Sequence, residues 1–142
     1  MQTKSQKALS TGIAILVAMV VGFGVESYMK KINGPSSMRT LNKVADEMNK
    51  SLPMMVDSET QLTNVIGMDK KFVYNYELIH LDSGNGLIDK ISQLKPNMVN
   101  ADCSTPETRD QFLKNGTTME YKYYDRNKNY LTAIDILPSD CP

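Results

Sequence analysis

KKFVYNYELIHL, residues 70–81, is the stretch of the chain that decides its fold. Its residues alternate between two faces, as they do in a β-strand, where successive side chains point to opposite sides. One face carries Phe72, Tyr74, Tyr76, Leu78 and His80, and the other carries Val73, Asn75, Glu77, Ile79 and Leu81. The stretch therefore predicts a strand, which the turn sequence DSGNG at 82–86 ends.

Two more alternating stretches follow near the end of the chain, TTMEYKYY (117–124) and YLTAIDIL (130–137). The Asn- and Asp-rich DRNKN between them predicts a hairpin turn. The first stretch places Met119, Tyr121 and Tyr123 on one face, which we expect to be the core side, and leaves Tyr124 on the other. The second stretch has four residues on one face: Tyr130, Thr132, Ile134 and Ile136. Upstream, residues 54–57 and 61–65 are predicted to be short extended segments.

Three segments have the pattern of helices. Residues 38–52 repeat apolar side chains at helical spacing after an N-cap at Ser36 or Ser37. Residues 87–94 predict a second short helix, stopped before Pro96. The third spans 104–115, with Pro106 in its first turn and a glycine at its end.

The elements of the domain follow one another in the order α-β-β-α-α-β-β. Short connections favour antiparallel pairing, and helices with one apolar stripe favour covering one face of a sheet. We therefore predict the α+β class: an N-terminal transmembrane helix, then a small domain whose antiparallel sheet is covered by helices on one face.

The predicted transmembrane helix rests on an uncharged run from Ala8 to Val25. A helix of that length spans about 27 Å, close to the thickness of the hydrocarbon core. A cleaved signal peptide is the main alternative, because Lys4 and Lys7 precede the run and Gly22-Phe23-Gly24 resembles a cleavage site. The third interpretation of this run is a helix buried in the core of the domain. We expect an uncleaved signal-anchor with its tail in residues 1–31, and a periplasmic domain in residues 32–142.

The two cysteines, Cys103 and Cys141, fit one disulfide in an oxidising compartment. Two free buried thiols in a cytoplasmic domain are the alternative. A bridge would close a loop of about 39 residues. By lowering the entropy of the unfolded chain it would stabilise the fold by roughly 4 kcal/mol. Lysines on both sides of the apolar run leave its orientation open. The cysteines favour a single-pass protein of the bacterial inner membrane with its C-terminal domain in the periplasm.

Residues 51–141 resemble a loose group of small, uncharacterised bacterial proteins that are exported or membrane-anchored. The matching pieces are LPMMVDSETQL, KFVYNYEL, CSTPETRDQFLKNGTTMEYKYYD and IDILPSDC. The resemblance implies a periplasmic domain and a bridge between Cys103 and Cys141. It implies no activity.

No constellation of residues predicts catalysis, a cofactor or a metal site. His80 is the one histidine and has no partner at a catalytic spacing. Asp57, Glu59 and Asp69 lack the ligand spacing of a calcium loop. With 16 basic and 16 acidic residues and no basic run, the chain also gives no support to nucleic-acid binding.

The tyrosines are the candidate binding residues. Five of the seven lie in two predicted strands: Tyr74, Tyr76, Tyr121, Tyr123 and Tyr124. Cross-strand packing explains such a set, and so does a protein-binding face. We expect a non-enzymatic, membrane-anchored accessory domain that binds a protein partner in an envelope assembly. The alternative is an envelope immunity or exclusion protein that inhibits an incoming toxin or phage factor.

Overall fold

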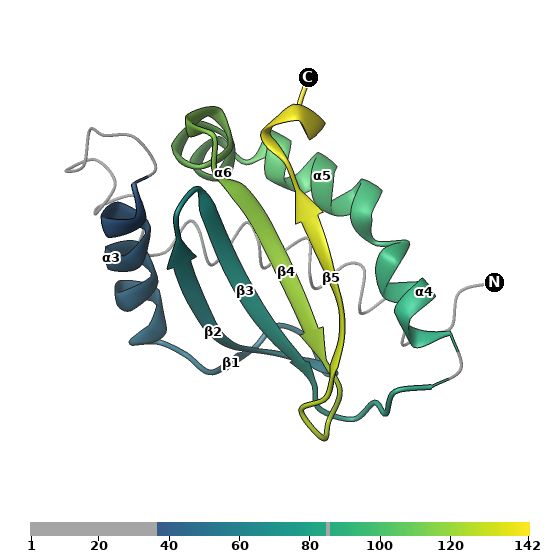
Figure 1. Cartoon of the computed structure of the whole chain (residues 1–142). Helices are drawn as coiled ribbons and strands as arrows, with labels where there is room; N and C mark the ends of the chain where they lie inside the picture. The colour runs from purple at the N-terminus through teal and green to yellow at the C-terminus, as the bar shows by residue number, and fades with distance from the viewer. Residues whose placement is uncertain (1–36, 85) are drawn as a thin grey trace.

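The computed structural model describes residues 37–84 and 86–142, which form a sheet with helices beside it (Figure 1). The predicted signal-anchor, and the boundary between residues 1–31 and 32–142, lie outside the described residues. Within the described ranges, no helix has the length and apolarity needed to cross a membrane. The predicted α+β class is confirmed for the domain.

Five strands make one sheet in the order β1-β2-β3-β4-β5. The strands are β1 (Met54–Met55), β2 (Thr60–Met68), β3 (Lys71–Leu78), β4 (Thr118–Tyr124) and β5 (Tyr130–Ile136). Neighbours are antiparallel except β3 and β4, which are parallel. The prediction of a wholly antiparallel sheet is therefore wrong at its centre. The helices between β3 and β4 return the chain to the end where β3 began, which is the crossover that parallel pairing requires.

The helices are α3 (Met38–Asn49), α4 (Leu87–Ser92), α5 (Lys95–Ser104) and α6 (Pro106–Gln111), with short 3-10 turns η1 (Leu113–Asn115) and η2 (Pro138–Asp140). Ser37 caps α3 as predicted, because its side chain accepts a hydrogen bond from the Thr40 amide. The second predicted helix ends before Pro96, as α4 does at Ser92, but Pro96 then stands in the first turn of a further helix, α5, where its missing N–H costs nothing. The order is therefore α-β-β-β-α-α-α-β-β, with one strand and one helix more than predicted.

The core lies between the helices and one face of the sheet. Buried side chains of α3 and α4, Met98 of α5, and Phe112 and Leu113 after α6 join one apolar cluster with the even-numbered residues of β3 and the odd-numbered residues of β4. The predicted core face of β4 is confirmed, because Met119, Tyr121 and Tyr123 are fully buried.

Helix α3 packs closely against β2. Gly67 makes this approach possible, because a Cβ there would lie 2.5 Å from the Asn42 amide nitrogen and closer still to the Leu41 carbonyl carbon. At the other end of the helix, the Asn49 side chain donates to the Val65 carbonyl and accepts from the Val65 amide, each at 2.9 Å. The helix therefore covers the edge of β2 that β1 leaves free.

The β4–β5 hairpin turns at the predicted sequence. The Asp125 carboxylate accepts from the backbone amides of Asn129 and Asn127 at 2.9 and 2.8 Å, and these hydrogen bonds, chiefly that from Asn129, hold its pKa below the usual range. The register slips beside the turn, and Leu131 is the extra residue of a bulge. The prediction that Tyr130 shares a face with Ile134 is wrong for this reason: Tyr130 pairs with Tyr124 instead.

Candidate protein-binding face of the sheet

Four of the five candidate tyrosines lie in the core. Tyr74 and Tyr76 of β3 and Tyr121 and Tyr123 of β4 are each at most 1% exposed. Parallel pairing places Tyr74 beside Tyr121 and Tyr76 beside Tyr123, and these ring pairs stack with centroids 5.0 and 5.5 Å apart. Burial raises the pKa of all four phenols, so they stay neutral. Their geometry is that of core packing.

A buried acid meets this tyrosine stack from α5. Asp102 is fully buried, and the Tyr121 hydroxyl donates to it. Burial raises the pKa of Asp102 to about 7, against the opposing effect of the Tyr121 hydrogen bond. No local pattern predicts this pair, because Asp102 stands in a helix that has no apolar stripe.

Tyr124 is the one candidate tyrosine that reaches the opposite face of the sheet. It lies in a groove of about 470 Å³ over β2, β3 and β4. The groove is lined by Thr63, Asn64, Ile66, Asn75, Glu77, Lys122, Tyr124 and Lys128. We call this surface the Tyr124 groove.

The Tyr124 groove combines apolar and charged side chains. Ile66 is 47% exposed, and beside the groove the ring of Tyr130, 58% exposed, packs edge-on against Tyr124 at 5.8 Å. Neither Lys128 nor Glu77 forms an ion pair with any described residue. Exposed apolar and aromatic side chains beside unpaired charges are typical of protein-recognition surfaces.

The sequence identified only part of the Tyr124 groove. Tyr124 was found because alternation places it opposite Met119, Tyr121 and Tyr123. Ile66 and Lys128 were missed, because β2 and the hairpin turn meet only through the sheet pairing. The sequence holds no local signal for Ile66, because residues 64–68 carry apolar side chains on both faces, although Val65 and Gly67 are buried and Ile66 and Met68 are exposed.

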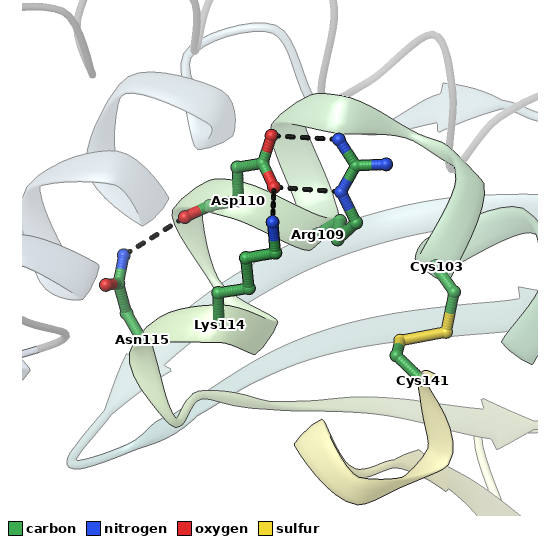
Figure 2. Close-up of polar contacts among 6 residues, drawn as sticks. All are labelled: Cys103, Arg109, Asp110, Lys114, Asn115 and Cys141. Carbon is green, nitrogen blue, oxygen red and sulfur yellow. Dashed lines mark hydrogen bonds and ion pairs between the residues drawn. A yellow bond between two sulfur atoms is a disulfide. The ribbon is translucent and has the colours of Figure 1, made fainter.

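The predicted disulfide is present. Cys103 at the end of α5 is bonded to Cys141 in the C-terminal segment (Figure 2). Nearby on α6 and η1, the Asp110 carboxylate receives two hydrogen bonds from Arg109 and pairs with Lys114 at 3.0 Å. Arg109 and then Lys114 hold the pKa of Asp110 well below its usual range. This cluster is exposed, so it contributes little to stability.

His80 stands just beyond β3 and is largely exposed. Its Nδ1 lies 3.2 Å from Oε2 of Glu59, an ordinary surface pair. Among the described residues, no three His, Cys, Asp or Glu side chains gather as metal ligands would.

Solved bacterial proteins share this fold. A protein described as secreted, from Pseudomonas aeruginosa, superposes with a TM-score of 0.62 at 13% identity, over 74% of this chain and 92% of its own. The pilotin EpsS of the Vibrio vulnificus type 2 secretion system gives 0.61 at 12%, over 74% and 91%. The type II secretion system pilotin AspS of Vibrio cholerae gives 0.55 at 10%, over 73% and 91%. No protein-family model and no curated protein matches the sequence. At these identities the likeness establishes the fold.

Proposed function

We propose that the protein is a membrane-anchored periplasmic accessory protein, which binds a protein partner within an envelope assembly and catalyses no reaction. Its fold supports this proposal, because two of the similar structures are pilotins of type II secretion systems. The partner is then a component of a secretion system or of a related envelope machine.

The proposed location rests on two features. The uncharged run from Ala8 to Val25 suits a single span of the inner membrane. The Cys103–Cys141 bond suits an oxidising compartment, and in bacteria that compartment is the periplasm. A periplasm-dependent reporter fused after Pro142 is expected to be active, with the chain in the membrane fraction. An inactive reporter would overturn the location, and soluble protein processed near Val25 would overturn the anchor.

The observation that carries the binding role is the placement of Tyr124. The strand that carries it buries its other tyrosines, yet Tyr124 stands half-exposed in a groove with exposed Ile66 and with Lys128, which forms no ion pair among the described residues. Tyrosine contributes large contact area at low entropic cost, and it is enriched among residues that dominate interface energies.

The test is partner capture with the full chain in detergent, comparing wild type, Tyr124→Ala and His80→Ala. Loss of a tyrosine that anchors an interface is expected to weaken capture about tenfold. His80→Ala is the matched control, because it removes a ring from a solvent-accessible position close to the end of a neighbouring strand. Equal capture by folded Tyr124→Ala and wild type would contradict this role. A His80→Ala protein that kept its partners but lost all function would favour an enzyme.

A further inference from the structure

The two edges of the sheet differ in how fully their backbone N–H and C=O groups are paired. On the β2 side, β1 pairs with residues 61 and 62, and the Asn49 side chain then satisfies both backbone groups of Val65. This matches the way in which proteins protect edge strands from pairing with other chains. On the other side, β5 is a seven-residue edge strand without proline, glycine or lysine.

The hydrogen-bond directions in β4 show which groups of β5 face outward. The Thr118 amide donates to the Lys70 carbonyl, so Thr118 faces β3. Because backbone groups alternate along a strand, Met119, Tyr121 and Tyr123 face β5. Their register partners Ile136, Ile134 and Thr132 are thereby paired. The residues between them, Ala133 and Asp135, direct their N–H and C=O groups away from the sheet.

These outward groups have no hydrogen-bond partner within residues 37–84 and 86–142. None of the backbone or side-chain hydrogen bonds there reaches the amide or carbonyl of Ala133 or Asp135, and both residues are half-buried rather than covered. The next outward amide, that of Leu137, donates to Asp140 Oδ2 at 2.8 Å. The free edge is therefore a short, defined segment centred on Ala133 and Asp135.

The charges beside this edge indicate which side chains a partner segment should carry. Asp135 lies directly opposite Glu120, and like charges in that position repel. Glu120 is neutralised by Lys71 at 3.4 Å and by Lys122 at 3.8 Å. Asp135 has no cationic partner in the described part of the chain, and its Oδ1 is shielded from solvent without a hydrogen bond. A cation beside a partly shielded carboxylate is stabilised more than one in open water.

We propose that the free edge of β5 accepts an extended segment of a partner protein as a sixth strand, with a lysine or arginine of that segment beside Asp135. Backbone hydrogen bonds to Ala133 and Asp135 provide the binding, and the cation provides the specificity. The proposal rests on the protein-binding role proposed above, but it concerns a surface separate from the Tyr124 groove.

The test uses the full chain in a zwitterionic detergent and two seven-residue peptides, one of alternating valine and lysine and the other with glutamate in place of lysine. The lysine peptide is expected to bind about tenfold more tightly, and to protect the amides of Ala133 and Asp135 from hydrogen exchange. Ala133→Pro removes one outward N–H without breaking a β4–β5 bond, so it is expected to weaken binding at least tenfold. Ala133→Ser, which keeps the N–H, is the matched control.

Two further variants separate the proposal from its alternatives. Asp135→Lys is expected to reverse the preference between the peptides, which keeps the test decisive if Ala133→Pro fails to fold. Tyr124→Ala is expected to leave peptide binding unchanged, so failure of the Tyr124 role and failure of the edge role are distinguishable. Unprotected amides at Ala133 and Asp135, or unchanged peptide preference in Asp135→Lys, would overturn the proposal. Self-association of the chain that protects the same amides would overturn it too, in favour of a second copy.

Discussion

The Tyr121 hydroxyl donates to both carboxylate oxygens of Asp102, at 3.0 Å to Oδ1 and 2.8 Å to Oδ2. Both residues are fully buried, and Asp102 immediately precedes the disulfide-bonded Cys103. The pair therefore joins α5 to the centre of the sheet at the point where the bridge fastens the C-terminal segment. A carboxylate in such a place makes the stability of the fold depend on pH.

The pKa of Asp102 is raised to about 7 in the folded protein, chiefly by burial. The pKa of an aspartate in an unfolded chain is about 3.9, so the folded state binds the proton more tightly. The contribution of protonated Asp102 to the free energy of unfolding is fully present below the unfolded-state pKa and is lost as pH rises through the folded-state pKa. We expect the free energy of unfolding to fall by roughly 3 kcal/mol between pH 5 and pH 8 from this residue.

Urea unfolding of wild type and Asp102→Asn across that pH range measures the effect. The amide of asparagine does not titrate, so the variant is expected to lose this part of the pH dependence whatever its stability at any one pH. Parallel pH profiles for the two proteins would show that Asp102 has an ordinary pKa in the folded state.

Gly67→Ala is expected to lower the free energy of unfolding by roughly 1–3 kcal/mol, because the new methyl group would collide with the backbone of α3 at Leu41 and Asn42. Gly84→Ala is the matched control, since a Cβ there has no atom within 4 Å. Chemical denaturation gives both values. A Gly67→Ala protein as stable as wild type would mean that α3 does not sit against β2 as described.

Cys141→Ser is expected to destabilise the domain by roughly 2–4 kcal/mol, because the bridge limits the freedom of the unfolded chain between residues separated by 38 positions. The measurement is thermal or urea unfolding of the variant and of wild type with and without reductant. Wild-type protein isolated without reductant should resist alkylation at both cysteines. Complete alkylation of the unreduced protein would show that the thiols are free.

Strands β3 and β4 and the buried face of β4 were predictable because alternation is a local pattern. Tyr121 and Tyr123 are buried and Tyr124 is not, as their positions in the strand indicate. Helix α5 was not predictable, because Lys95–Ser104 has no apolar stripe and because a proline suits the region after a helix as well as a helix's first turn. The parallel pairing of β3 and β4 depends on the path of the three helices between them, which no local pattern contains.

The candidate site was predictable only where one strand supplies it. Tyr124 follows from alternation in β4, whereas Ile66 and Lys128 come near it through pairing between segments far apart in sequence. The bulge at Leu131 changed the face of Tyr130, and a single extra residue of that kind leaves no signal in an alternating stretch.

The most direct test of the central claim, that the protein binds a partner through the Tyr124 groove, is photo-crosslinking in living cells. A photoreactive phenylalanine analogue replaces Tyr124 in one version of the full chain and Met38, an exposed residue of α3, in a control. We predict that the analogue at position 124 crosslinks to a protein of an envelope assembly and that the analogue at position 38 does not. Folded, membrane-bound protein that gives no crosslink from position 124, or the same crosslinks from both positions, would contradict the claim.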